Sequence, residues 1–389
     1  MRKLFSILAF IVLLIVIFAL ISRRQGGAEI QAELVPSAET GASDLVPVEF
    51  DRAYGPRPLS FPEDLGAHPD FQTEWWYYTG NLATKDGRHF GYQLTFFRRA
   101  LVPPQDGQPR ESIWRTDQVY LAHFAITDVQ SDRHRAFERY SRGSAGLAGA
   151  QSHPYQVWLR DWSVVQDEKG TYHLHADQDG WIIDLTLEDT KGPILQGNQG
   201  YSQKGPQPGN ASFYISQTSL ETGGILQTDE GQFSVSGASW MDHEFSTSAL
   251  SEDQVGWDWF ALQLDDGSEL MVFNIRKVDG SIDPYSSGTM IYPDGSTRSL
   301  TRDDFRLEVQ ETWRSPESGA NYPSRWKIVV PSERLELEIQ PYIADQELNL
   351  RYEYWEGAVS LRGERKGNPV AGNGYVELTG YAGSFAGEF

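Results

Sequence analysis

GASWMDHEF, residues 237–245, sets three adjacent ionisable side chains between large apolar ones. Segments of this composition normally build a protein core, where an ionised carboxylate is costly unless it is paired or hydrogen-bonded. In a strand, alternate side chains point to opposite faces, so Trp240, Asp242 and Glu244 share one face and His243 lies on the other. A carboxyl group beside an indole in a pocket wall favours its protonated form and becomes an acid near neutral pH. The alternative is that Asp242 and His243 form a satisfied polar pair that fixes the end of a strand.

A second segment of this kind, HPDFQTEWWYYTGNL at residues 68–82, places an acid before four consecutive aromatic residues. Alternation divides the segment between two faces, with Glu74, Trp76 and Tyr78 on one and Trp75 and Tyr77 on the other. Because both faces carry aromatic rings, the pattern predicts a strand that is buried on both sides, as in a barrel or sandwich.

The rest of the chain has the pattern of an all-β protein. Short apolar runs with strand spacing alternate with turn residues, and no long amphipathic helix is visible beyond the N-terminal region. Asp-Gly pairs, which favour tight hairpins, occur at 86–87, 179–180, 266–267 and 294–295. We therefore expect antiparallel sheets built largely from hairpins.

Several short sequence segments, taken together and in their order along the chain, resemble the AttH-like, carotenoid 1,2-hydratase-like family of lipocalin-type proteins. Besides residues 68–82, they are GYQLTFFR at 91–98, AHFAITD at 122–128, FYIS at 213–216, WMDHEF at 240–245, YWEGAV at 354–359 and GYVELTGY at 374–381. The resemblance implies two tandem lipocalin-like β-barrel or sandwich domains with a pocket for an apolar molecule. Some relatives add water to an isolated carbon–carbon double bond.

The N-terminus predicts attachment to a membrane. An uncharged apolar run, Leu4 to Ile21, is long enough to cross a bilayer as a helix and is followed by two arginines without a small-x-small cleavage motif. This pattern favours an uncleaved anchor over a removed signal peptide. We expect a cell-membrane protein with its soluble domains on the periplasmic, extracytoplasmic side. The predicted organisation is an anchor or signal segment at 1–24, a flexible tether at 25–57, a first lipocalin-like domain at 58–230 and a second at 231–389.

Composition narrows the classes of partner. The formal net charge of −21 argues against nucleic-acid binding, because phosphate recognition needs basic clusters. The chain has no cysteine, which excludes disulfides and thiolate metal sites. His173 and His175 share a strand face without a third ligand nearby in the sequence, so we expect no metal site there, and no cofactor.

Two hypotheses for function follow, an enzyme and a carrier. Hydration of an isolated alkene needs a positioned acid and aromatic faces that stabilise a cation, which a buried carboxyl in an aromatic pocket supplies. The carrier hypothesis is a lipid-binding partner of an ABC-type exporter permease, as the family resemblance and the predicted anchor imply. The expected catalytic residues are Asp242, His243 and, as reserve acid, Glu74; the expected ligand-binding residues are Trp240, Trp75, Trp76, Tyr78, His123 and Tyr214.

The topology is testable with protease added to intact spheroplasts. The expected result is digestion of the domains that follow the anchor, because they lie outside the cytoplasm. Protection of the whole soluble part would contradict this orientation.

Overall fold

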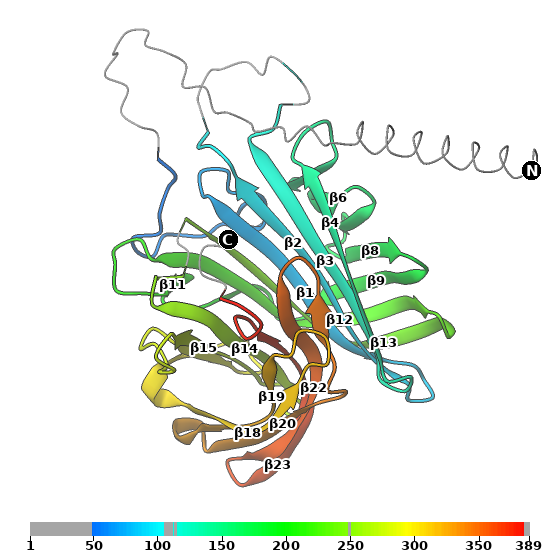
Figure 1. The fold of residues 1–389 in the computed structure, drawn as a ribbon, viewed down its shortest axis with the longest axis vertical. Helices are drawn as coiled ribbons and strands as arrows, with labels where there is room; N and C mark the ends of the chain where they lie inside the picture. The colour runs from blue at the N-terminus through cyan, green and yellow to red at the C-terminus, as the bar shows by residue number, and fades with distance from the viewer. Residues whose placement is uncertain (1–48, 105–111, 113–114, 248–249, 385–389) are drawn as a thin grey trace, which may run out of the picture. The chain divides into compact units, whose positions relative to one another are not determined.

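The computed structural model describes residues 49–104, 112, 115–247 and 250–384, and almost all of their regular structure is β-strand (Figure 1). Three short 3-10 turns complete it, η1 (Glu63–Leu65), η2 (Arg302–Asp304) and η3 (Pro331–Glu333). No helix within these ranges is long and apolar enough to cross a membrane. The predicted anchor and most of the predicted tether lie outside the described residues. The all-β prediction is confirmed.

The first thirteen strands form one antiparallel sheet, in the order β4-β3-β2-β1-β13-β12-β9-β8-β7-β6-β5, with β10 and β11 paired to β12. Their bounds are β1 (Thr73–Ala83), β2 (His89–Ala100), β3 (Gln118–Asp128), β4 (Arg133–Arg142), β5 (Ala148–Ser152), β6 (Tyr155–Leu159), β7 (Trp162–Gln166), β8 (Tyr172–Gln178), β9 (Trp181–Asp189), β10 (Ile194–Leu195), β11 (Tyr201–Gln203), β12 (Ala211–Thr228) and β13 (Gly231–Ser246).

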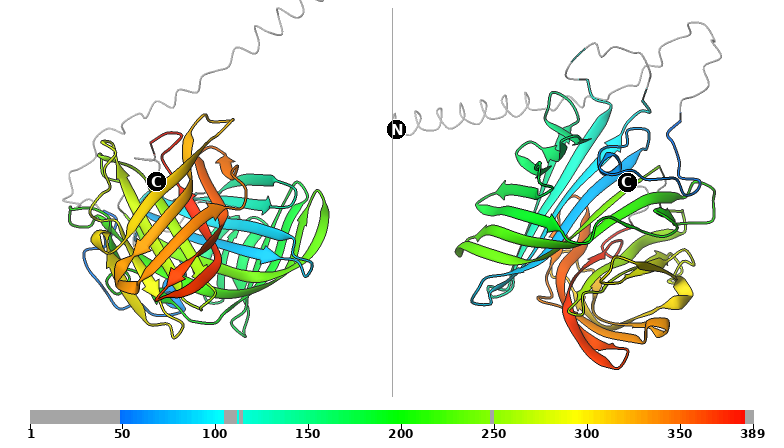
Figure 2. Two further views of the ribbon diagram at one scale, coloured as in Figure 1. Left: turned by 90° about the horizontal axis from the view of Figure 1, so that it is seen from below. Right: turned by 180° about the vertical axis from the view of Figure 1, so that it is seen from behind.

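The other ten strands form a second antiparallel sheet, in the order β17-β16-β15-β14-β23-β22-β20-β19-β18, with β21 paired to β22. Their bounds are β14 (Gln254–Leu264), β15 (Glu269–Lys277), β16 (Ser287–Ile291), β17 (Thr297–Thr301), β18 (Arg306–Arg314), β19 (Asn321–Val330), β20 (Leu335–Pro341), β21 (Glu347–Asn349), β22 (Glu353–Arg365) and β23 (Asn368–Leu378). Figure 2 shows this sheet curled into a nearly closed barrel, whereas the first sheet is a more open half-barrel. The tandem lipocalin-like architecture is therefore confirmed.

The predicted Asp-Gly turns connect neighbouring strands as expected. Gly87, Gly180, Gly267 and Gly295 have φ angles of +90°, +85°, +79° and +79°, a backbone conformation that glycine adopts without strain. They join β1 to β2, β8 to β9, β14 to β15 and β16 to β17.

The first sheet extends further along the chain than the domain boundary at 230/231 predicts. Strand β13 pairs with β1 and β12, so the chain leaves the first sheet only after Ser246 and enters the second at Gln254. The polar residues at the predicted boundary form the hairpin between β12 and β13, where Thr228 pairs with Gly231. A tight hairpin and a linker share this composition, which explains the difference.

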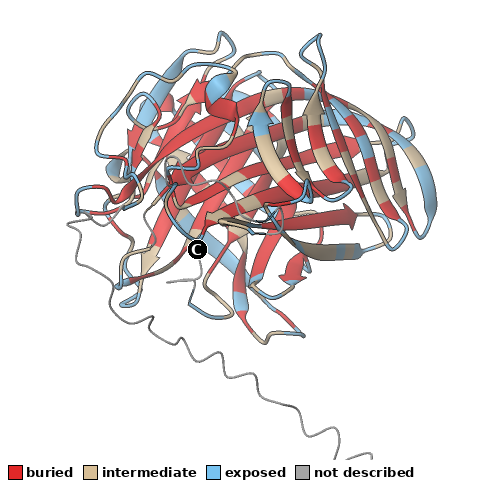
Figure 3. Ribbon diagram, turned by 90° about the horizontal axis from the view of Figure 1, so that it is seen from above, coloured by how far each residue is buried: buried red, intermediate tan, exposed pale blue. Residues whose placement is uncertain are grey.

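The larger apolar cores among the described residues fill the inside of each sheet and the space between the two sheets. One lies inside the first sheet and includes Trp76, Tyr78 and Met241, and a second lies inside the other sheet around Trp326. The third is made by residues of both sheets, including Tyr77 and Trp259. Figure 3 shows buried residues along most central strands and exposed ones at hairpins and edges. Strands β1 and β13 contribute to the first and third cores and are therefore buried on both faces.

A buried ionic network ties the segment before β1 to the inside of the first sheet. The Glu74 carboxylate, which has no exposed surface, accepts hydrogen bonds from Arg98 Nε at 2.8 Å and His243 Nε2 at 2.9 Å. His68 donates to it from its backbone N–H and from Nδ1 at 2.7 Å, and the other ring nitrogen of His68 contacts Asp64 at 3.0 Å.

Charge complementarity sets the protonation states in this network. Burial alone would raise the pKa of Glu74, but the hydrogen bonds from His243 and His68 and the charge of Arg98 hold it well below its usual range. Burial alone would lower the pKa of His68, but its two carboxylate partners raise it. Glu74 is therefore an ionised structural anchor and not a proton donor.

Loss of the Glu74 carboxylate should be strongly destabilising. Glu74→Ala leaves the Arg98 guanidinium buried without its partner, which typically costs about 3–5 kcal/mol of unfolding free energy. Glu336→Ala is the matched control, because Glu336 pairs with Lys327 at 2.6 Å but is 57% exposed, and such surface pairs contribute about 0–1 kcal/mol. Denaturant unfolding measures both, and equal losses would contradict the assignment.

Candidate functional site

The strand register aligns a row of polar side chains across the outer face of the first sheet. Successive partners are Ser216 on β12, Asp242 on β13, Tyr77 on β1, Thr95 on β2 and His123 on β3. All five are buried. Paired positions of adjacent strands point to the same face, so these groups from distant parts of the chain meet between the two sheets.

The second sheet contributes a matching row. Phe273 on β15, Trp259 on β14, Glu377 on β23 and Glu356 on β22 are successive register partners. Glu356 and Glu377 thus lie directly opposite one another on neighbouring strands. Two ionised carboxylates in such a pair would repel each other.

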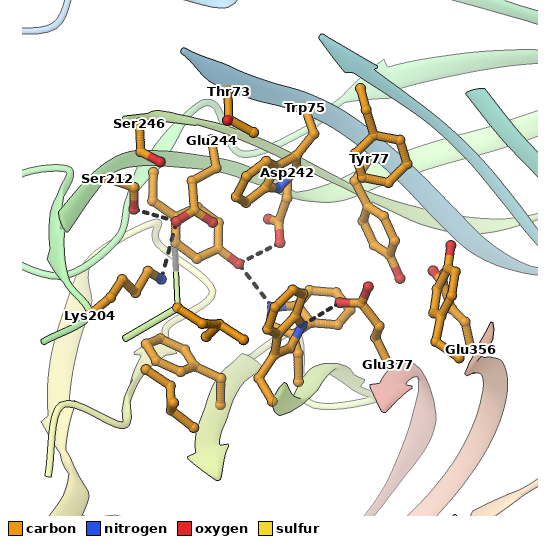
Figure 4. Close-up of a pocket in the computed structure, with 18 of the residues that line it drawn as sticks. Thr73, Trp75, Tyr77, Lys204, Ser212, Asp242, Glu244, Ser246, Glu356 and Glu377 are labelled. Atoms are coloured by element: carbon orange, nitrogen blue, oxygen red, sulfur yellow. Dashed lines mark hydrogen bonds and ion pairs between the residues drawn. The ribbon is translucent and has the colours of Figure 1, made fainter. Parts of the chain in front are cut away.

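A cavity of about 160 Å³ lies between these rows (Figure 4). Its lining is mainly aromatic and combines four carboxyl groups with one ammonium group, that of Lys204. The aromatic residues are Trp75, Tyr77, Phe97, Tyr214, Trp257, Trp259, Phe273 and Tyr354, and the acids are Asp242, Glu244, Glu356 and Glu377.

Asp242 is the best-positioned acid in this lining. Its Oδ1 accepts hydrogen bonds from Ser216 at 2.5 Å and Trp240 Nε1 at 2.7 Å, and its Oδ2 accepts one from the Tyr214 hydroxyl at 2.5 Å. Tyr214 in turn accepts from Trp259 Nε1 at 2.9 Å. These bonds fix the carboxyl group against the cavity wall.

The protonation of Asp242 reflects two opposing effects. Burial disfavours the charged form, whereas the hydrogen bonds from Ser216, Tyr214 and Trp240 favour it. Burial dominates and raises the pKa of Asp242 to about 7. Near neutral pH the group therefore exists in both forms and can exchange a proton with a bound molecule.

The two glutamates of the second sheet are also shifted upward. Burial, together with the charges of Asp242 and Glu244, raises the pKa of Glu377 to about 7, although a hydrogen bond from Trp257 at 2.8 Å opposes the shift. Burial and the neighbouring Glu377 raise the pKa of Glu356 well above its usual range. Burial therefore favours the neutral, protonated form of Glu356.

Lys204 is the cation of the lining. Its ammonium nitrogen lies 3.2 Å from Glu244 and 4.2 Å from the centre of the Phe273 ring, and Ser212 also donates to Glu244. The Lys204 ammonium group therefore offsets the negative charge of Glu244 within the lining.

The predicted site residues divide between the two faces of the first sheet. Asp242, Trp75, His123 and Tyr214 line the cavity, and Trp240 supports Asp242 from the adjacent core. Glu74, His243, Trp76 and Tyr78 face the interior of the first sheet instead. His243 is next to Asp242 in sequence but points the opposite way, so neither it nor Glu74 can act with Asp242 on one ligand.

One cluster of described residues has metal-ligand chemistry, but its charges disfavour an ion. The side chains of His68, Glu74 and His243 lie within 4.8 Å of one another. Arg98 already neutralises Glu74, and its guanidinium group would repel a metal cation. The cluster is better explained as the structural network described above.

The comparisons identify the family. The model of the AttH-like family matches residues 52–381. The chain belongs to the AttH-like family. A crystal structure from Nitrosomonas europaea assigned to AttH is 36% identical, covers 84% of this chain and 97% of its own, and superposes with a TM-score of 0.75. Kievitone hydratase from Nectria haematococca has the same fold with a TM-score of 0.65, at 13% identity and with 86% and 96% of the two chains covered. A search of curated proteins found no match.

Sequence reasoning missed most of the residues that line the cavity. Tyr77, Glu356, Glu377, Trp257 and Trp259 line the cavity but were not predicted as site residues. Two of them carry the signal that identified Asp242, since Glu356 and Glu377 are lone acids inside apolar, aromatic strands. Lys204, Trp257 and Trp259 lie outside the sequence segments on which the family resemblance rests.

A small apolar molecule should bind this cavity. Engineered apolar cavities of about 150 Å³ bind benzene, so saturating benzene should raise the melting temperature of the protein by mass action. Ile275→Phe fills part of the lining and should reduce the shift, whereas Val278→Phe adds the same ring at an exposed position and should leave it unchanged. An undiminished shift in Ile275→Phe would place the ligand elsewhere.

Proposed function

We propose that this AttH-like protein is a cofactor-independent hydratase that protonates an isolated carbon–carbon double bond with Asp242. The observation that carries the proposal is the Asp242 carboxyl group, fully buried in an aromatic cavity and fixed by three hydrogen-bond donors. A pKa of about 7 leaves this acid protonated in a large share of molecules near neutral pH.

The reaction has a simple balance. The Asp242 proton forms a C–H bond at one alkene carbon, and the positive charge develops at the other. A water oxygen then forms the C–O bond and releases a proton to a carboxylate, so the net change is alkene plus water to alcohol.

The cavity wall supports the cationic intermediate. Trp75, Trp257 and Trp259 present aromatic rings around the space next to Asp242. Aromatic faces stabilise positive charge, and the carboxylate left on Asp242 adds electrostatic attraction. An alkene that gives a tertiary cation suits this environment best.

The cavity volume limits the substrate class. About 160 Å³ accommodates one branched five-carbon or benzene-sized group, and a longer molecule must extend through the opening. This favours the terminal unit of an isoprenoid as the reacting group. The fold of kievitone hydratase supports the general idea that this architecture can host hydration.

The alternative function, a lipid carrier that serves an exporter, remains a second prediction. It rests on the expected membrane anchor and on an exporter permease as partner, and it requires a space for a long apolar chain. The size of the cavity and the set of shifted carboxyl groups favour the enzyme. We further propose that the enzyme acts at the cell membrane, outside the cytoplasm, where apolar isoprenoids concentrate.

Asp242→Asn should abolish most turnover without loss of the fold. The amide retains hydrogen-bonding groups but cannot deliver the proton, so turnover of a trisubstituted alkene should fall by about 10²–10⁴-fold. Wild-type activity should also decline as pH rises through about 7, because the acid loses its proton.

Glu347→Gln provides the control for Asp242→Asn. Glu347 is equally buried in the second barrel, where Tyr322 donates to it, but it does not line the cavity. This variant should retain full activity. A stable Asp242→Asn protein with normal turnover would exclude Asp242 as the acid, and a product without deuterium at carbon after reaction in D₂O would exclude the hydration route.

A further inference from the structure

We propose that Glu356, Glu377 and Tyr77 form a binding subsite for a hydroxyl group within the cavity. It holds a water molecule when no ligand is bound and the hydroxyl group of an alcohol when one is. The existence of this subsite is independent of catalysis; its role as the source of the attacking water rests on the proposed function.

Unpaired polar atoms point to this subsite. Glu356 is 1% exposed, and neither of its carboxyl oxygens has a hydrogen-bond partner among the described residues. The buried hydroxyl group of Tyr77 and Nε2 of His123 are also unpaired, and all three residues line the cavity. Buried polar atoms in native proteins are nearly always hydrogen-bonded, so a polar ligand or ordered water is expected between them.

The arrangement of these groups leaves space for a bridging molecule. Figure 4 shows Tyr77 between Asp242 and Glu356, with Glu377 directed toward the same space. Tyr77 and Tyr354 are both close enough to Glu356 to influence its ionisation, yet neither meets the geometry of a direct hydrogen bond to it. One small molecule between Tyr77 and Glu356 would satisfy both.

The chemistry of the subsite selects a hydroxyl group. A neutral carboxyl group both donates and accepts hydrogen bonds, as does the Tyr77 phenol. Water and alcohols offer the same pair of functions. An anionic ligand would face Asp242 and Glu377, and Lys204, the cation among the described lining residues, is already paired with Glu244.

The Glu356–Glu377 pair gives the water a proton acceptor. The two side chains are register partners, so they favour a state in which one carboxyl is protonated and the other is ionised. When a water oxygen attacks the cation, its released proton passes to the Glu377 carboxylate. The Tyr77 hydroxyl can then donate its proton to Asp242 while it accepts the one from Glu377, which restores the starting state.

Three ligands of one shape test the subsite in the full-length protein. They are tert-amyl alcohol, 2-methyl-2-butene and the tert-amylammonium ion, which share a branched five-carbon skeleton and differ in the polar group. Tryptophan fluorescence titration should show tighter binding of the alcohol than of the alkene by about 10-fold, the usual effect of one or two net hydrogen bonds.

Two tyrosine variants provide the matched comparison. Tyr77 and Tyr375 both have buried, unpaired hydroxyl groups, but only Tyr77 lines the cavity. Tyr77→Phe should remove most of the preference for the alcohol, and Tyr375→Phe should preserve it. Glu356→Leu should also remove most of the preference for the alcohol. Glu356→Gln, which is closer in shape to glutamate, is the second variant in case Glu356→Leu does not fold. Equal binding of alcohol and alkene by the wild type, tighter binding of the ammonium ion, or equal effects of both tyrosine variants would overturn the proposal.

Turnover in D₂O separates this proposal from the hydratase proposal. With geraniol as probe, Glu377→Gln should still exchange deuterium into the recovered geraniol through Asp242. It should form at least 10-fold less of the hydration product, a diol, than the wild type relative to that exchange. Loss of both processes in parallel would overturn the role of Glu377 in the water step. If the wild type neither labels geraniol nor forms the diol, the hydratase proposal is contradicted. The comparison of tert-amyl alcohol with 2-methyl-2-butene would still decide the subsite.

Discussion

The pairing of β1 with β13 determines the arrangement of the rest of the molecule. Both strands are buried on both faces, because one face closes the core of the first sheet and the other packs against the second sheet. Side-chain alternation then separates neighbouring residues by function. Glu74 and His243 stabilise the interior of the first sheet, whereas Asp242, Trp75 and Tyr77 form the cavity.

Burial between two sheets also gives the cavity its acidity. The chain carries a net charge of −21, but the important carboxyl groups are those that water cannot reach. Asp242, Glu356 and Glu377 line one small cavity, and the ammonium group among its described lining residues, that of Lys204, is paired with Glu244. Burial raises the pKa of all three groups and so favours their protonated forms.

Local sequence predicted the parts of this site that depend on strand alternation. The faces of residues 74–78 and 240–245 follow from a period of two, and the Asp-Gly turns follow from backbone preference. The pairing of β1 with residues far along the chain could not be predicted in this way, because register across sheets is a long-range property. The structure places His243 and Glu74, two of the expected catalytic residues, on the face of β13 and β1 opposite Asp242, as side-chain alternation indicates. The first sheet extends past the predicted domain boundary because a polar hairpin, here residues 228–231, resembles a linker in composition.

The pKa of Asp242 tests the central claim most directly. With ¹³C-labelled aspartate side chains, NMR titration of the wild type and of Asp242→Asn identifies the Asp242 carboxyl signal and follows it with pH. We predict a midpoint near 7, caused by burial between the two sheets. A midpoint near 4, the ordinary value for aspartate, would show that the group is ionised and solvated at neutral pH and would contradict its role as a proton donor.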